Sequence, residues 1–205
     1  MPTDRVLRDD ALITKIVEQV LKSDSLLEKI SQVIGEKTAA IIKAYEQKVV
    51  SLEVKLAKAY EDIDSLEQYS RLNNLRLYGI PETPNENTDA MVASICKDKL
   101  GITIPPESID CSHRLGKVEN GHRPIVVKFC VRNIKQSIYN NKRKLKNTKI
   151  VIREDLTKQR LALMKDVKKR LGVAWTNHCK IFTKVGNRIY NVKTTSDLDN
   201  LTTVK

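Results

Sequence analysis

Apolar residues in the first part of the chain recur at alternating steps of three and four positions. Residues 10–70 contain no proline and one glycine, Gly35. This spacing lines up apolar side chains as positions a and d of a heptad, which is typical of a coiled coil. The predicted seam consists of Ile42, Tyr45, Val49, Leu52, Leu56, Ala59, Ile63 and Leu66. We expect a long helix that associates with further copies of itself through this seam.

The sequence leaves two features of this helix undecided. An upstream apolar series, offset by one residue from the seam, predicts a break, bend or register change between Gly35 and Ile42. Dimer and trimer both remain open, because Leu56 at position a and Tyr45 and Ala59 at position d depart from the pattern of dimers. The alternative to self-association is a helix that folds back on the rest of the chain.

Residues 74–81 alternate apolar and polar side chains, which is typical of a strand with one buried face. Leu75 and Leu77 are expected to face the core. Arg76 and Tyr78 are expected on the opposite, open face, where an arginine and a tyrosine suit contacts with phosphates and bases.

Residues 123–129 form a second segment of this kind. Val127 and Phe129 are expected in the core, and Val126 and Lys128 on the open face. We expect the two strands to be neighbours at the centre of one sheet, so that their polar residues form one surface.

Between and after these strands, helical and strand-like patterns alternate. Helices are predicted over residues 89–100 and 132–144, and strands over residues 109–115 and 149–152. The resulting order β-α-β-β-α-β is that of the ferredoxin-like topology, which RNA-recognition domains share with many unrelated proteins.

The last fifty residues predict a smaller unit. A helix over residues 155–171 is followed by strands over residues 180–185 and 188–192, which flank the hairpin turn Gly186–Asn187. The predicted fold class is α+β: a long helical coiled coil over residues 1–70, an RRM-like domain over residues 71–153 and a small α/β domain over residues 154–205.

The positive charge of the chain lies after residue 70. Residues 1–70 carry 10 Lys and Arg against 13 Asp and Glu, whereas residues 71–205 carry 27 against 12. So basic a region indicates a polyanionic partner, with nucleic acid first and an acidic membrane surface second. The predicted contacts are Arg76, Tyr78, Arg114 and Lys128 on the open side of the sheet, and two basic clusters, Lys142, Arg143, Lys144, Lys146 and Lys165, Lys168, Lys169, Arg170.

Patterns of catalysis and metal binding are missing from the sequence. It has no glycine-rich phosphate loop, no Gly-x-Ser-x-Gly and no His-Glu-x-x-His. Its four cysteines, Cys96, Cys111, Cys130 and Cys179, are too widely spaced for a CxxC pair. No apolar run reaches the roughly 18 residues that span a bilayer. We expect no enzymatic activity, cofactor, metal or small-molecule substrate, and a location in the cytoplasm or nucleus.

Four short segments carry a resemblance to known proteins. They are Glu67–Glu82, Ser112–Gly116, Arg123–Phe129 and Glu154–Thr157. In this order they resemble the first-open-reading-frame protein of LINE-type retrotransposons and the baculovirus few-polyhedra protein with its arthropod relatives. The resemblance covers roughly residues 60–200.

The resemblance implies a coiled-coil oligomer, trimeric in the retrotransposon proteins, followed by domains that together coat single-stranded nucleic acid. It adds Asn74 to the predicted contacts and matches Arg76, Arg114, Lys128 and Lys165. The expected function is a homo-oligomeric, chaperone-like protein of retroelement origin that binds single-stranded RNA or DNA. The alternative is a coiled-coil structural or interaction protein of the few-polyhedra type, whose basic domain docks on acidic proteins or membranes.

Overall fold

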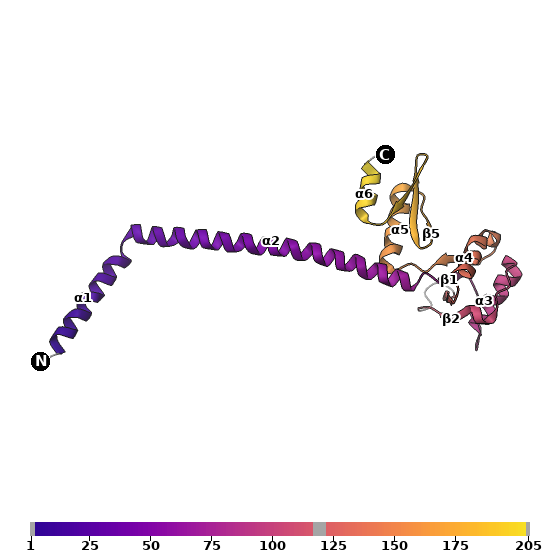
Figure 1. Ribbon diagram of the computed structural model, residues 1–205, viewed down its shortest axis with the longest axis horizontal. Helices are drawn as coiled ribbons and strands as arrows, with labels where there is room; N and C mark the ends of the chain where they lie inside the picture. The colour runs from indigo at the N-terminus through magenta and orange to yellow at the C-terminus, as the bar shows by residue number, and fades with distance from the viewer. Residues whose placement is uncertain (1–2, 117–121, 204–205) are drawn as a thin grey trace. The chain divides into compact units, whose positions relative to one another are not determined.

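The computed structural model describes residues 3–116 and 122–203, which form α-helices and antiparallel sheets (Figure 1). The chain divides into two compact units, Met1–Tyr60 and Glu61–Lys205. The domain limits predicted at residues 70 and 153 remain predictions.

The N-terminal part consists of two helices, α1 at Thr3–Leu21 and α2 at Asp24–Ser70. Of the break, bend or register change predicted between Gly35 and Ile42, the break is wrong, because both residues lie inside the continuous helix α2. The bend and the change of heptad register stay predictions. A single glycine costs a helix only about 1 kcal/mol relative to alanine. The helical part is interrupted instead at residues 22–23, where the sequence Ser23-Asp24-Ser25 begins. Such side chains compete for backbone hydrogen bonds and favour helix ends.

The predicted seam on α2 is open in the single chain. Its seven larger side chains, Ile42, Tyr45, Val49, Leu52, Leu56, Ile63 and Leu66, are each more than half exposed. Val50, Val54 and Tyr60 extend the exposed apolar surface beyond the seam. So much exposed apolar surface on one long helix is consistent with self-association. Among the described residues, no helix combines the length and the apolar character needed to cross a membrane.

A four-stranded antiparallel sheet forms the centre of the first half of the second unit. Its strands are β1 at Asn74–Tyr78, β2 at Ile109–Arg114, β3 at Ile125–Phe129 and β4 at Val151–Glu154. Their order across the sheet is β2-β3-β1-β4. The prediction that residues 74–81 and 123–129 supply two neighbouring central strands is confirmed.

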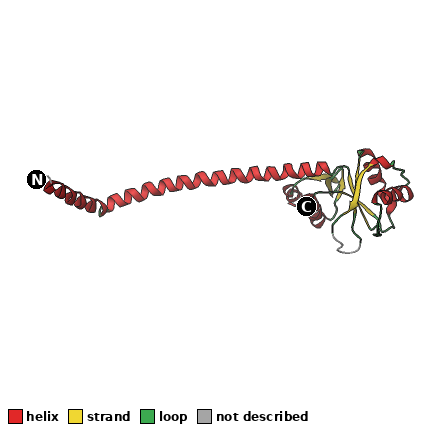
Figure 2. Ribbon diagram, turned by 90° about the horizontal axis from the view of Figure 1, so that it is seen from below, coloured by secondary structure: helices red, strands yellow, loops and turns green. Residues whose placement is uncertain are grey.

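Helices α3, at Thr88–Ile95, and α4, at Arg132–Asn141, cover one face of this sheet (Figures 1 and 2). A π-helical turn at Cys96–Leu100 prolongs α3, and a 3₁₀ turn at Lys142–Leu145 prolongs α4. The side chain of Asn87 caps α3 by accepting a hydrogen bond from the amide of Ala90 at 3.0 Å. The core between helices and sheet includes Leu75, Leu77, Val92, Leu100, Ile125, Val127, Phe129, Ile138 and Ile152.

Strand β4 lies two residues later than the predicted strand 149–152 because Glu154 is buried at its end. Lys135 Nζ donates to Glu154 Oε1 at 2.6 Å, and both side chains are almost fully buried. The amide of Cys179 donates to Glu154 Oε2 at 3.0 Å. Both carboxylate oxygens are therefore satisfied, which a buried charge requires. This contact joins β4 and α4 to the C-terminal part of the unit.

Gly79 ends β1 earlier than predicted. It has φ +78°, and a Cβ atom at this position would lie 2.0 Å from the carbonyl oxygen of Lys149. Only glycine combines this backbone conformation with so close an approach to the carbonyl group of Lys149. The positive φ turns the chain away from the direction of the strand.

The C-terminal part consists of helices and a three-stranded sheet. Helix α5 at Lys158–Leu171 precedes β5 at Trp175–Asn177, β6 at Lys180–Val185, β7 at Arg188–Val192 and α6 at Thr195–Thr203. The strand order is β5-β6-β7, which confirms the predicted hairpin. Its core consists of Leu163, Val167, Leu171, Ile181, Val192 and Leu198. Three-residue β5 was not predicted, since so short a segment shows no alternation.

The last turns of α2 are tied to the segment that leads into α5. The buried side chain of Gln68 donates to the carbonyl oxygen of Asp155 at 2.9 Å and accepts from the amide of Thr157 at 3.0 Å. Arg160 Nε donates to Asp64 Oδ2 at 2.7 Å. These hydrogen bonds fix the path of the chain between β4 and α5.

Candidate nucleic-acid interface

The face of the first sheet turned away from α3 and α4 gathers polar side chains from all four strands. Directly paired residues of antiparallel strands point to the same face. The pairing sets His113 opposite Val126, Val126 opposite Arg76, and Arg76 opposite Arg153. Cys111, Lys128 and Asn74 form a second row, and Tyr78 and Val151 a third. We call these nine residues the platform.

Arg76, in the middle of the platform, is held by Asp155. Its Nε donates to Asp155 Oδ1 at 2.5 Å. Asn74 Nδ2 donates to Oδ2 of the same carboxylate at 3.0 Å, and Arg71 Nη1 lies 3.4 Å from Oδ1. The Asp155 side chain is 5% exposed, whereas that of Arg76 is 25% exposed. Asp155 therefore orients Arg76 and offsets part of its charge, while the guanidinium still reaches the surface.

Lys128 is paired more loosely. Its Nζ lies 2.6 Å from Asp110 Oδ2, and both side chains are about half exposed. The hydrogen bond to Asp110 raises the pKa of Lys128 above its usual value, so the lysine stays charged. Exposed ion pairs are weak because water screens them. A phosphate can therefore compete with Asp110 for Lys128.

Arg153 is a platform residue that the sequence pattern did not predict. It is exposed, and its guanidinium lies 5.2 Å from the centre of the Tyr78 ring, within cation–π range. His113 is likewise exposed on the platform and was not among the predicted contacts. A strand that extends to Glu154 would have predicted Arg153 on the open face, because exposed Arg153 then alternates with buried Ile152 and Glu154. Val126, predicted on the open surface, is buried within its row.

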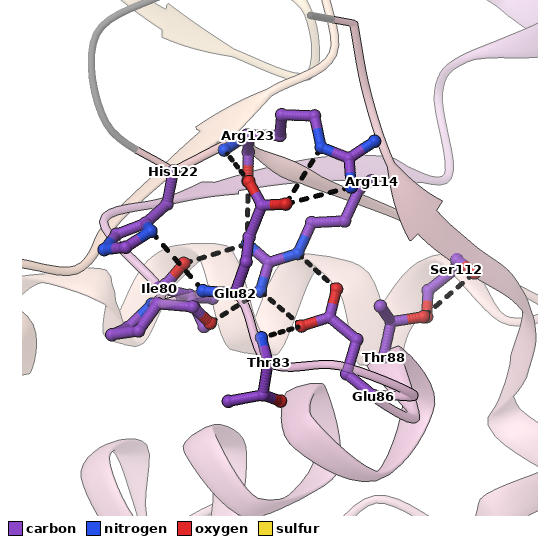
Figure 3. A network of polar contacts seen from close by, with 10 residues as sticks. Ile80, Glu82, Thr83, Glu86, Thr88, Ser112, Arg114, His122 and Arg123 are labelled. Atoms are coloured by element: carbon purple, nitrogen blue, oxygen red, sulfur yellow. Dashed lines mark hydrogen bonds and ion pairs between the residues drawn. The ribbon is translucent and has the colours of Figure 1, made fainter. Parts of the chain in front are cut away.

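Arg114 does not belong to the platform, and its predicted position there is wrong. It pairs with Ile125, a core residue, because the register shifts between Ile109 and Cys111. Its Nε and Nη2 donate to the two carboxylate oxygens of Glu86 at 2.7 and 2.8 Å (Figure 3). Its side chain is 5% exposed. Further hydrogen bonds to the carbonyl oxygens of Ile80, Pro81 and Arg123 engage the guanidinium within the protein.

This network lowers the pKa of two carboxyl groups. The hydrogen bond from Arg114 is the largest cause that lowers the pKa of Glu86 to about 2. Hydrogen bonds from the side chain and the amide of Arg123 lower the pKa of Glu82. Figure 3 shows the contacts of Glu86 with Arg114 and of Glu82 with Arg123. Arg114 thus connects β2 with the loop before α3.

The cluster Lys142, Arg143, Lys144 and Lys146 follows α4, the helix on the other face of the sheet. Lys142 Nζ lies 3.4 Å from the centre of the Tyr139 ring, and burial lowers the pKa of this lysine. Lys144 Nζ donates to the carbonyl oxygen of Leu100 at 2.7 Å. Arg143 and Lys146 are less engaged, and both are exposed. The structure does not bring this cluster onto the platform.

The second predicted cluster lies on α5. Lys165, Lys168 and Lys169 lie away from the buried residues of this helix and are exposed to solvent. Arg170 Nη1 lies 2.5 Å from Asp199 Oδ1 in α6.

Of the residues predicted to bind nucleic acid, the structure places Asn74, Arg76, Tyr78 and Lys128 together on one face of the sheet.

Comparison of the sequence with protein-family models and with curated proteins found no match. Function must therefore be inferred from the residues of the platform and their surroundings. Among the described residues, no group of three or more His, Cys, Asp and Glu side chains is placed to hold a metal ion.

Proposed function

We propose that the chain is a homo-oligomeric protein that binds single-stranded nucleic acid through the platform. One observation carries this proposal: Lys128, Arg76 and Arg153 come from three adjacent strands and share one face of the sheet. Arg76 is paired directly with Arg153, and Lys128 lies one row away on the strand that neighbours Arg76. Side chains at direct and diagonal positions across strands are close enough to contact successive phosphates of one backbone. Tyr78, beside Arg153, offers a ring on which a base can stack.

The composition of the platform favours a single strand held mainly by charge. Buried Val126 sits in the central row, where a sequence-reading sheet needs an exposed aromatic ring. Charged contacts to phosphates carry little sequence information, and they weaken steeply with salt. We therefore assign weak sequence preference and strong salt dependence to the interaction.

The arrangement of the elements supports a ferredoxin-like, RRM-like domain. Its chain order is β1-α3-β2-β3-α4-β4, and its strand order is β2-β3-β1-β4 with both helices on one face. The exposed seam of α2 supports a coiled coil that joins several such domains. Joined copies raise each other's effective concentration at the ligand, so weak single sites suffice for tight overall binding. The resemblance to retrotransposon proteins supports a trimer, chaperone-like activity and a retroelement origin.

Equilibrium binding tests the proposal. Fluorescence anisotropy of the full chain with a labelled single-stranded RNA, the matching DNA strand and the duplex is measured between about 50 and 200 mM salt. We expect both single strands to bind more tightly than the duplex. Affinity is expected to fall by at least about tenfold over this range. No binding at low salt would overturn the proposal and favour a structural or interaction role.

A further inference from the structure

The three-stranded sheet also has an open face, which the proposed function leaves unused. Helices α5 and α6 lie on the side of the sheet that carries Ile181 and Val192 (Figure 1). The strand pairing places Trp175 of β5 directly beside Phe182 of β6. Directly paired residues share a face, and Phe182 is neighboured along β6 by the buried residues Ile181 and Thr183, which point the other way.

Two aromatic rings meet on this open face. The ring centres of Trp175 and Phe182 lie 6.2 Å apart with an interplanar angle of 22°. Both side chains are partly exposed, and neither belongs to the core cluster that α5 and α6 form with the sheet. Ile189, on the neighbouring strand, is 63% exposed. The rings therefore lie outside the core that holds this part of the unit together.

The charge around these rings has one sign. The 30 residues between Asp166 and Asp197 contain seven Lys and Arg and no Asp or Glu. Lys180 and Lys184 flank Phe182 on the same side of β6, and both are exposed. Neither forms an ion pair among the residues that the structure describes. The face thus combines stacked rings with cations and lacks any carboxylate of its own strands.

We infer that this face is a second contact surface for single-stranded nucleic acid, in which bases stack on Trp175 and Phe182 while Lys180 and Lys184 contact phosphates. The inference rests on the proposed function and adds to it a second surface on which bases stack. An acidic peptide would satisfy the lysines but would leave the flat ring pair without a planar partner. Nucleotides supply both the ring and the negative charge.

Trp175 reports on this surface directly, because it is the one tryptophan of the chain. The full chain is titrated with a fluorescein-labelled oligouridylate, with anisotropy and tryptophan emission followed in parallel. We expect quenching of Trp175 that saturates at the same concentration as the anisotropy. An abasic oligonucleotide of equal length is expected to bind more weakly and to leave the emission unchanged.

Two variants separate stacking from charge. Phe182→Leu is expected to lower affinity for oligouridylate by at least about fivefold, because one base stack is removed. Lys180→Glu with Lys184→Glu is expected to lower affinity and to flatten the salt dependence. Lys97→Glu with Lys99→Glu makes the same change of charge at two exposed lysines beside α3 and is expected to have a smaller effect.

The outcomes separate this inference from the proposed function. Binding without quenching, unaffected by Phe182→Leu and by the Lys180 and Lys184 pair, would overturn the inference and leave the platform in place. Absence of any binding at low salt would overturn both. Because Lys180 and Lys184 are exposed, their variant tests the surface even if Phe182→Leu fails to fold, which circular dichroism shows.

Discussion

Arg76 donates a hydrogen bond to the carboxylate of Asp155, with 2.5 Å between Nε and Oδ1. The two residues are 79 positions apart in the chain. Arg76 belongs to β1, one of the two central strands of the sheet, and Asp155 follows the edge strand β4. Asp155 therefore links the position of the proposed binding arginine to the segment that leads into α5, and it limits the charge that the platform presents.

Asp155→Asn is expected to lower stability and to strengthen binding of nucleic acid. The substitution weakens the charge-assisted hydrogen bonds from Arg71 and Arg76, which is expected to cost about 1–3 kcal/mol of unfolding free energy. It also removes a negative charge beside the platform, so affinity for single-stranded RNA is expected to rise severalfold. Urea denaturation and anisotropy measure the two effects. Asp62→Asn, at an exposed position of α2, is the control, and equal stability of the two variants would contradict the account.

Arg153→Glu combined with Lys128→Glu tests the platform without disturbing Asp155. Arg76 is a poor choice for this purpose, since a glutamate there would face a buried carboxylate. We expect affinity for single-stranded RNA to fall by at least about tenfold at low salt. The slope of log affinity against log salt is expected to decrease by about 0.7 for each phosphate that the variant no longer neutralises. Lys97→Glu with Lys99→Glu is the matched control, and an equal fall in affinity for both variants would refute a specific platform.

Val49→Asp combined with Leu56→Asp is expected to dissociate the oligomer, because it places two carboxylates in the apolar seam at a spacing of one heptad. Sedimentation equilibrium of the full chain measures the mass. Ala44→Asp with Ser51→Asp introduces the same charges at the same spacing outside the seam and is expected to remain oligomeric. A monomeric parent chain, or an oligomer that tolerates Val49→Asp and Leu56→Asp, would disprove the coiled coil.

The pair of Glu86 and Arg114 predicts a dependence of stability on pH. The pKa of Glu86 is lowered from 4.5 to about 2 in the folded chain, so the unfolded chain binds the proton more readily. The stabilisation is fully present above about pH 4.5 and decreases as pH falls toward about 2. The difference in Tm between the parent and Glu86→Gln is therefore expected to be constant above about pH 5 and to shrink below it. Thermal unfolding of both proteins from about pH 2 to 7 measures this difference, and a constant difference would contradict the assignment.

Local patterns in the sequence were sufficient to predict most helices and strands of the fold. Alternation placed Leu75 and Leu77 in the core and Arg76 and Tyr78 on the other face, as the structure shows. The turn Gly186–Asn187 was sufficient to predict the hairpin of β6 and β7, because glycine tolerates the positive φ of +57° found there.

Interactions between distant residues account for what the sequence did not reveal. The end of β4 depends on the buried pair of Glu154 with Lys135, whereas charged residues in a sequence are ordinarily expected outside the core. The side of the sheet on which Arg114 lies depends on the irregular register of β2. The partner of Arg76 could not be predicted, because nothing near it in the sequence points to Asp155. The composition of the platform was therefore only partly predictable.

Photocrosslinking of the full chain to a single-stranded oligonucleotide that contains 4-thiouridine, followed by peptide mapping, tests the central claim most directly. The measurement identifies the ligand and the site together. The account predicts crosslinked peptides from β1, β3 and β4, the strands that carry Arg76, Lys128 and Arg153. Crosslinks confined to α2 or to the cluster at residues 142–146 would contradict it.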